Sequence, residues 1–220
     1  MHKRKVRFAL GALLVAALFL SAGHAVALDT EVGQTEVRLE GDRALIRTQE
    51  TNLGNLVTDL MRAETGADIA LTNGGGLRDS VEPGPITLEN VLEIHPFENA
   101  VVTIELTGAE VVEALEHGVS RHPDDWGGFP HVSGIVYSFN TNAEPGSRVQ
   151  EVRYQGGPID PEATFVVATN DFLSAGGDEF TMLKKDHLEE FATLESMIIS
   201  YLQENSPVAP EVEGRIVIYE

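Results

Sequence analysis

The sequence has 220 residues, and its 35 aspartates and glutamates outweigh its 15 lysines and arginines to give a formal net charge of −20 at pH 7. A chain this acidic repels phosphate backbones and anionic lipids, which argues against general nucleic-acid or membrane-surface binding. The sequence contains no cysteine, which excludes disulfides, thiolate metal sites and lipid attachment at an N-terminal cysteine. An anionic ligand must therefore be bound by a few placed arginines.

Residues 1–27 have the pattern of a cleaved secretory signal. A basic start precedes an apolar run from Phe8 to Leu20, and small residues follow at Ala25 and Ala27. The apolar run is short for a membrane span, so a retained anchor is the weaker alternative. The leader holds four of the 15 basic residues and none of the 35 acidic ones, so cleavage would change the net charge from −20 to −24. We therefore expect a secreted or periplasmic protein without membrane attachment.

After the leader, residues 28–42 are polar and are expected to form a loose lead-in. Asn52 can cap a helix whose apolar residues recur on one face, and Gly66 ends it. The next strand leads into the loop TNGGGLRDS, in which three consecutive glycines precede Arg78. The elements expected in this part are a strand at 43–49, the helix at 53–65 and a strand at 68–73.

The middle of the chain contains two further helix starts. Thr87 precedes the pattern of a short helix that ends at the residues HPF. Thr107 and Glu110 form a capping box, because the hydroxyl and the carboxylate can each pair with an otherwise free amide. A polar loop, HPDDWGGFPH, follows at 122–131. The elements expected here are a helix at 88–94, a strand at 99–107 and a helix at 109–121.

The last third of the chain has mostly strand patterns. Its expected elements are strands at 134–141, 148–154 and 164–170, a second glycine loop at 170–180, a helix at 194–205 and a strand at 215–220. Helices and strands are intermingled along the chain without regular βαβ repetition. This order predicts an α+β (mixed α/β) fold, with one domain over residues 43–220 and one mixed sheet flanked by helices.

Both glycine loops follow a strand, where ligand-binding residues concentrate on a rigid scaffold. Three glycines allow the backbone to approach a ligand closely, with amides free to donate to anionic oxygens. Arg78 adds planar donors that suit a phosphate or a carboxylate. Phe97 and Phe172 lie in polar loops, where two rings can hold a flat ring by stacking; packing of each ring into the core is the alternative.

Six segments between Arg47 and Leu183 form a longer pattern: ETNLGNLVTDLMR, ALTNGGGLRDS, ITLENVLEIHPFEN, TGAEVVEALEHGV, SGIVYSF and ATNDFLSAGGDEFTML. Together they resemble the C-terminal, substrate-binding domain of the secreted 5′-nucleotidases, a family that includes periplasmic UDP-sugar hydrolases and ecto-5′-nucleotidases. The resemblance implies the fold of that domain and a part in the extracytoplasmic hydrolysis of nucleotides.

The resemblance also implies a set of polar substrate-binding residues. Arg47 matches the family arginine that contacts the nucleotide phosphate. Asn73 and Arg78, in the loop that includes Gly75, match residues that bind the ribose hydroxyls or the phosphate region. Asp178 matches an acidic residue that accepts hydrogen bonds from the ribose.

The two aromatic residues complete the implied site. Phe97 and Phe172 match the pair that stacks on the base from both sides. Asp171 departs slightly from the family pattern, because some relatives carry asparagine there, and this leaves the stacking role of Phe172 intact.

The resemblance does not extend to catalysis. Family members carry an N-terminal metallophosphatase domain with two metals, whereas the sequence before Arg47 has no D-x-H, G-N-H-D or G-H-x-H motif. His117 fits a structural role better than a ligand, and Asp124 with Asp125 fits a solvated turn better than a cation site. We therefore expect no catalytic residue, metal ligand or cofactor in this chain, and a divalent metal pair only on a separate metallophosphatase domain.

Three functions fit this pattern. In the first, a separately encoded metallophosphatase domain supplies the metals and this chain recognises the nucleotide. In the second, the chain is a stand-alone nucleotide- or nucleoside-binding protein without catalysis, although a single open face buries less of a ligand than a cleft does. In the third, a degenerate domain serves surface contacts, and the presence of all the implied site residues counts against it.

Overall fold

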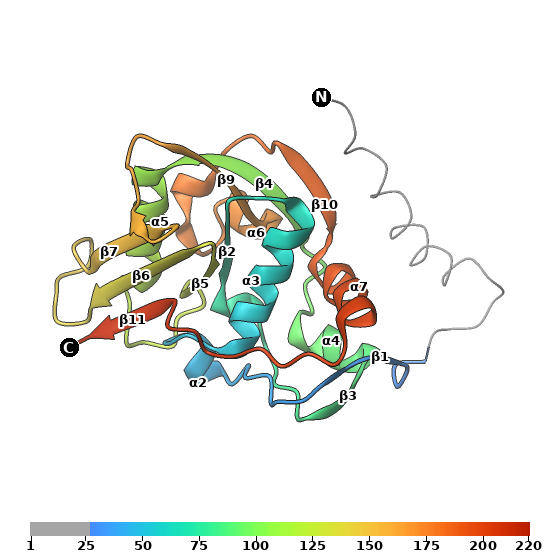
Figure 1. Ribbon diagram of the computed structural model, residues 1–220. Helices are drawn as coiled ribbons and strands as arrows, with labels where there is room; N and C mark the ends of the chain where they lie inside the picture. The colour runs from blue at the N-terminus through green and yellow to red at the C-terminus, as the bar shows by residue number, and fades with distance from the viewer. Residues whose placement is uncertain (1–26) are drawn as a thin grey trace.

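The computed structural model describes residues 27–220, so the predicted secretory signal lies outside the described residues except for Ala27 (Figure 1). The mixed α/β class is confirmed, but the strands that were expected in one sheet are divided among sheets of five, four and two strands. Within the described residues, no helix combines the length and the apolar character needed to cross a membrane.

The five-stranded sheet is the centre of the molecule. Its neighbours pair antiparallel, except that β2 and β9 run parallel, so the carboxyl ends of these two strands meet at one edge of the sheet. In spatial order the strands are β10 (Glu189–Thr193), β4 (Ala100–Thr107), β9 (Thr164–Asn170), β2 (Ile69–Asn73) and β5 (Pro130–Ser133).

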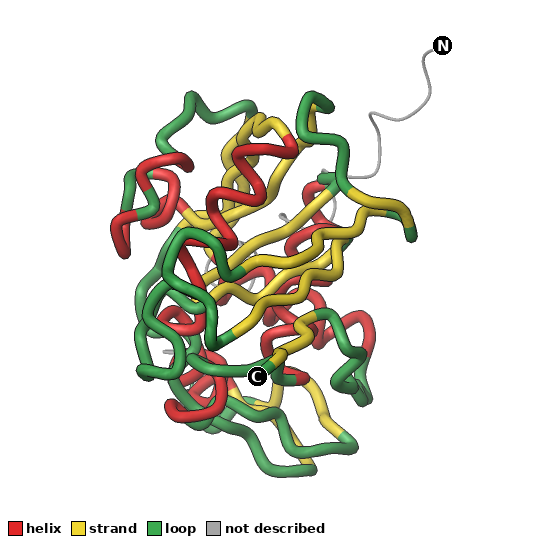
Figure 2. Tube along the Cα trace, turned by 90° about the vertical axis from the view of Figure 1, so that its left-hand side faces the viewer, coloured by secondary structure: helices red, strands yellow, loops and turns green. Residues whose placement is uncertain are grey.

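Both faces of the central sheet are covered (Figures 1 and 2). Side chains of a strand alternate between its faces, so Ala70 and Ala168 join the core on one face while Leu71 and Val167 join the core on the other. The first face is covered by α3 (Asn52–Thr65), α4 (Leu88–Ile94) and α7 (Leu194–Asn205), and the second by α5 (Gly108–Val119) and the four-stranded sheet.

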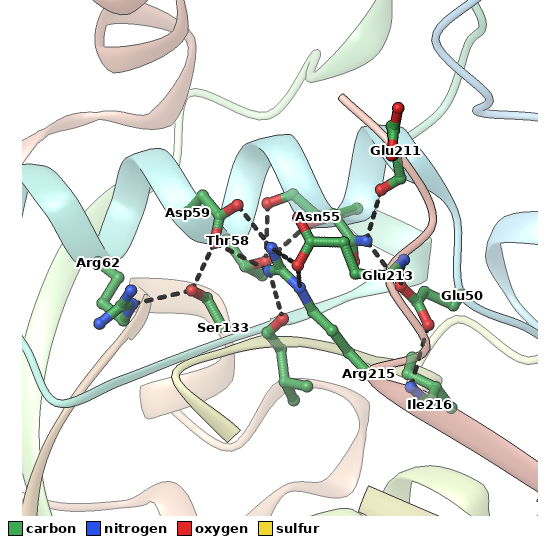
Figure 3. A network of polar contacts seen from close by, with 12 residues as sticks. Glu50, Asn55, Thr58, Asp59, Arg62, Ser133, Glu211, Glu213, Arg215 and Ile216 are labelled. Carbon is green, nitrogen blue, oxygen red and sulfur yellow. Dashed lines mark hydrogen bonds and ion pairs between the residues drawn. The ribbon is translucent and has the colours of Figure 1, made fainter. Parts of the chain in front are cut away.

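The four-stranded sheet ends with the last strand of the chain, which pairs parallel to β6. Arg215, just before that strand, donates to both carboxylate oxygens of Asp59 on α3 at 2.8 and 2.7 Å and also binds Glu213 (Figure 3). This network joins the C-terminal segment to α3. In spatial order the sheet contains β11 (Ile216–Tyr219), β6 (Ile135–Asn140), β7 (Val149–Tyr154) and β8 (Gly157–Pro158).

The predicted helices are confirmed, with small changes at their ends. Helix α3 starts at Asn52, but its cap is Thr51, whose side chain accepts from the amide of Gly54. Gly66 ends α3 in the left-handed region at φ 67°, as expected of a C-terminal glycine. Capping boxes start α4 and α5, and α7 spans the predicted residues.

Two predictions for the N-terminal part are wrong. Residues 43–49, expected as a strand, contain the helical turn α2 (Arg43–Ile46), because the side chain of Asp42 accepts from the amide of Ala44 and caps it. The lead-in expected to be loose contains β1 (Glu31–Thr35), which pairs antiparallel with β3 (Gly84–Thr87). Strands β3, β5, β8 and β10 were not predicted either, since all four are short. Strands β3, β5 and β10 also pair with distant segments, whereas β8 has two residues and pairs with the adjacent β7.

Candidate functional site

The site is built where β2 and β9 end side by side. Asn73 is the last residue of β2, and Asn170 is the last residue of β9. The side-chain nitrogen of Asn170 donates to Asn73 Oδ1 at 3.3 Å, and its oxygen accepts from the amide of Leu173 at the start of α6 (Asp171–Ser174). Asn170 therefore connects both glycine loops, a role that the sequence analysis missed.

A cavity of about 520 Å³ opens at this edge of the sheet. All seven residues that were predicted to bind the substrate line it, so segments far apart in the chain meet there. Four further lining residues were not predicted. The predicted residues are Arg47, Asn73, Gly75, Arg78, Phe97, Phe172 and Asp178, and the additional ones are Arg43, Gly76, Asn99 and Gly127.

Arg47 provides a buried cation at the cavity. Arg47 directly follows α2 in the chain, and it is only 6% exposed. Nη1 donates to the backbone oxygen of Asp125 at 3.2 Å, while Nε finds no partner among residues 27–220. Burial, together with the positive charges of Arg43 and Arg78, lowers the pKa of Arg47. An incoming anion would supply an opposite charge.

Arg43 is one helical turn before Arg47. Its Nε pairs with Asp125 Oδ2 at 2.7 Å, and both side chains are largely exposed. The four-residue spacing of the two arginines was visible in the sequence, but reading residues 43–49 as a strand hid the helical turn that brings them together. Asp125, considered for a cation site from the sequence, serves as the partner of Arg43 instead.

The two predicted stacking residues are exposed in the cavity wall. Phe97 is 44% exposed and Phe172 is 43% exposed, so the alternative of packing into the core is wrong for both. The guanidinium carbon of Arg78 lies 5.1 Å from the centroid of the Phe97 ring, within the range of a cation–π contact. The Phe172 ring lies so close to Gly177 that a Cβ there would come within 2.5 Å of it.

A hydrogen bond connects the two segments that carry the aromatic rings. Asn99, two residues after Phe97, donates from Nδ2 to Asp171 Oδ1 at 2.8 Å, next to Phe172. The bond is partly buried and crosses from the loop after α4 to the start of α6. It limits the relative movement of the two rings.

Asp178 and Asn73 form the polar part of the cavity wall. Asn73 Nδ2 donates to Asp178 Oδ2 at 2.8 Å. Asp178 has a φ of 47°, which is unfavourable for a residue other than glycine, and its backbone oxygen accepts from His117 Nε2 at 2.8 Å. His117 therefore has the structural role expected of it, and it holds the strained turn that presents the Asp178 carboxylate.

The glycine triplet has a different role from the one expected. The amides of Gly74 and Gly75 donate to the backbone oxygens of Phe129 and Gly127, each at 2.7 Å. A Cβ on Gly74 would lie 2.2 Å from the oxygen of Ile46, and one on Gly75 would lie 2.7 Å from the Cα of Gly127. These glycines permit close contact between chain segments, so the expectation that their amides are free for a ligand is wrong.

The donors at the cavity do not resemble a metal site. Among the described residues that line the cavity, Asp178 is the single carboxylate and none is a histidine. Within residues 27–220, no group of three or more histidine, aspartate or glutamate side chains is placed to hold a metal ion. The cavity offers arginines, amides and aromatic rings, which suit an organic anion.

These features define a mixed α/β domain with a cationic and aromatic ligand pocket at the carboxyl ends of two parallel strands. The sequence pattern of the family described as 5′-nucleotidase, C-terminal domain, matches residues 31–185. The chain therefore belongs to this family, and the resemblance noted in the sequence is confirmed.

The relatives are longer than this chain. It is 41% identical over 198 residues to the trifunctional nucleotide phosphoesterase YfkN of Bacillus subtilis, a match that covers 84% of this chain and 14% of that protein. It is 35% identical over 183 residues to UshA of Escherichia coli, covering 82% of this chain and 32% of UshA. The crystal structure of a 5′-nucleotidase precursor from Thermus thermophilus superposes with a TM-score of 0.82 at 40% identity, over 95% of this chain and 41% of that one.

Proposed function

We propose that the cavity binds a nucleoside monophosphate and that the chain is the nucleotide-recognition unit of an extracytoplasmic 5′-nucleotidase. The observation that carries this proposal is the meeting of three arginines and two exposed phenylalanines at one cavity. In a chain with a net charge of −20, a local group of arginines is the place where an anion can bind against the general repulsion.

In this proposal, the aromatic rings and the arginines bind different parts of the nucleotide. Phe97 and Phe172 take the base, because stacking on an aromatic side chain contributes about 1–3 kcal/mol per base and accepts any base. Arg47 and Arg78 take the phosphate. Both arginines line the cavity, and the positive charges of Arg43 and Arg78 act on Arg47, which supports the binding of an anion there.

Asn73 and Asp178 take the ribose in this proposal. The carboxylate of Asp178 is held by one hydrogen bond from Asn73 and retains acceptor capacity for the two neighbouring hydroxyls of a ribose. The strained backbone at Asp178 supports a role in binding, because strain persists where a side chain must be presented in one direction.

Hydrolysis of the phosphate ester requires chemistry that the cavity residues do not supply. Two-metal phosphatases bind the ions through several carboxylates and histidines, whereas Asp178 is the single carboxylate at this cavity. We propose that a metallophosphatase domain outside these 220 residues holds the divalent metal pair. Secretion of the chain and release from the membrane also belong to this proposal, supported by the leader-like pattern of residues 1–27.

Calorimetric titration of the purified chain with AMP and with adenosine tests the assignment. We expect Arg47→Ala to weaken AMP binding and to leave adenosine binding unchanged, and Phe172→Ala to weaken both. Tyr219→Ala removes an exposed aromatic ring outside the cavity and serves as the control. Equal loss of AMP and adenosine in Arg47→Ala would show that the phosphate is bound elsewhere.

A second measurement tests whether this chain binds the nucleotide without hydrolysing it. The purified chain with manganese, zinc or cobalt is expected to release no phosphate from AMP above the level of Phe172→Ala. Turnover by the unmodified chain that Phe172→Ala lacks would show that the 220 residues are a complete enzyme. Binding without turnover, and without any metallophosphatase recovered from the secreted fraction, would favour the stand-alone binding protein.

A further inference from the structure

The polar loop at 122–131 contacts three different parts of the pocket. The backbone oxygens of Gly127 and Phe129 accept from the glycine triplet. The ring of Trp126 lies parallel to that of Phe180, next to the Asp178 turn, with centroids 6.4 Å apart. The third contact is with α2 and Arg47, and it is made by the two histidines at the ends of the loop.

These two histidines bind the backbone on either side of Arg47. His131 Nε2 lies 2.7 Å from the oxygen of Ile46, and His122 Nε2 lies 3.1 Å from the oxygen of Thr48. A carbonyl oxygen can only accept, so each ring carries its proton on Nε2 and donates it. The residue before Arg47 and the residue after it are therefore both fixed to the same loop.

Arg47 needs this support because its own element is weak. Helix α2 has four residues, and a single helical turn has little stability by itself. The middle of the loop contributes as well, since the backbone oxygen of Asp125 accepts from Arg47 and its carboxylate accepts from Arg43. No carboxylate among the described residues forms an ion pair with Arg47.

We propose that His122 and His131 are positioning residues that hold Arg47 in its ligand-binding orientation before the ligand arrives. The proposal rests on the proposed nucleotide function and names residues that act on the phosphate through Arg47 without touching the ligand. A donor that is already ordered loses less conformational entropy when an anion binds. The histidine clamp, defined as His122 and His131 with their two carbonyl acceptors, thus favours phosphate binding.

The two histidines of the clamp can orient Arg47 as uncharged hydrogen-bond donors. Burial lowers the pKa of His131 to about 4, and burial also lowers the pKa of His122 below its ordinary value. Both rings are therefore neutral at pH 7, and they orient the backbone without attracting the phosphate away from Arg47. A carboxylate in the same place would compete with the phosphate for the guanidinium.

Hydrogen exchange in the ligand-free chain tests the clamp directly. His122→Leu keeps the apolar contact with Phe139 but removes the donor, whereas His122→Gln keeps an amide donor. We expect amides in residues 43–49 to exchange faster in His122→Leu than in the unmodified chain, with restored protection in His122→Gln. His122 is half-buried, so both variants are expected to fold, and circular dichroism checks this.

Calorimetry with AMP and adenosine then tests the effect on the ligand. His122→Leu is expected to bind AMP about five- to tenfold more weakly, which corresponds to the loss of one partly buried hydrogen bond, and to bind adenosine as before. His122→Gln is expected to recover most of the AMP affinity. A merely structural role of His122 would weaken both ligands together and would not be rescued by glutamine.

The two measurements separate the failure of the clamp from the failure of the proposed function. Unchanged exchange at residues 43–49 in His122→Leu, or equal loss of AMP and adenosine, would overturn the clamp. Absence of AMP binding by the unmodified chain would overturn the nucleotide function, and the positioning role of the clamp would be withdrawn with it. Exchange would still report whether His122 orders residues 43–49.

Discussion

Two buried arginines in this protein have opposite surroundings. Arg215 is 8% exposed, and its guanidinium binds Asp59, Glu213 and the backbone oxygen of Val132 (Figure 3). Arg47 is 6% exposed, makes one hydrogen bond to a backbone oxygen and has an Nε without a partner among the described residues. Burial opposes both charges, but the carboxylates raise the pKa of Arg215, whereas the pKa of Arg47 is lowered.

The difference separates an arginine that is paired with carboxylates inside the fold from an arginine that is not. Arg215 has its counter-charges inside the protein, so its interactions stabilise the fold and leave little for a ligand. Arg47 is buried without an ion pair, and the nearby carboxylates of Asp125 and Asp178 only partly offset the cost of burying its charge. Under the proposed function, a bound anion would offset more of this cost.

The largest expected effect is on stability in acid and concerns His131 of the clamp. Its folded pKa of about 4 lies below the ordinary value of 6.5, so above pH 6.5 the ring is neutral in both states and has no effect. Between pH 6.5 and about 4, His131 binds a proton in the unfolded chain but stays neutral in the folded chain. This difference destabilises the fold by up to about 3 kcal/mol.

Urea unfolding at pH 7 and pH 4.5 measures this effect. Acidification also affects the many carboxylates of the chain, so the comparison is made against His131→Gln, which retains all of them. The unmodified chain should lose more stability on acidification than His131→Gln. Equal losses in the two proteins would contradict the assignment of a neutral buried His131.

The next effect is on the structural arginine. Arg215→Met should lower the free energy of unfolding by about 2–3 kcal/mol, somewhat below the cost of breaking a fully buried pair because Asp59 and Glu213 are partly exposed. AMP affinity should not change in the folded variant. Arg153→Met removes an exposed arginine paired with Glu151 and should leave the free energy of unfolding almost unchanged.

The matching substitution at the pocket should give the opposite result. Arg47→Met removes a buried charge that forms no ion pair, so the free energy of unfolding should stay within about 0.5 kcal/mol or rise by about 1 kcal/mol. AMP affinity should fall roughly thirtyfold, or about 2 kcal/mol. Unfolding and calorimetry on the same sample check both. A loss of stability as large as that of Arg215→Met would remove the distinction between the two arginines.

The smallest expected effect concerns the bond between the two aromatic segments. Asn99→Ala breaks the hydrogen bond to Asp171 and should lower stability by about 1 kcal/mol. It should weaken AMP and adenosine alike by a few-fold, because it loosens the rings and leaves Arg47 in place. Asn142→Ala, at an exposed turn, is the control. Unchanged affinity for both ligands would show that the rings are held by their own packing.

Local chemistry explains which elements were predictable. The capping boxes at Thr87 and Thr107 satisfy amides three residues away, so a short segment carries the whole signal. The turn at Arg43 has four residues, too few for a period to separate a strand from a helix. Strands β1 and β10 depend on partners more than 50 residues away, as the pairing of Glu31 with Thr87 and of Glu189 with Thr103 shows.

From the sequence alone, the helix starts, the mixed α/β class and the residue types of the pocket could be determined, because each depends on neighbours within a few positions or on a pattern of motifs. The tertiary structure decided which arginines and backbone amides already have a partner within the protein. Arg43 meets a carboxylate 82 residues away, and the amides of Gly74 and Gly75 are taken by a distant loop. Whether a buried cation or amide is satisfied depends on contacts between segments far apart in the chain, and local sequence does not encode these contacts.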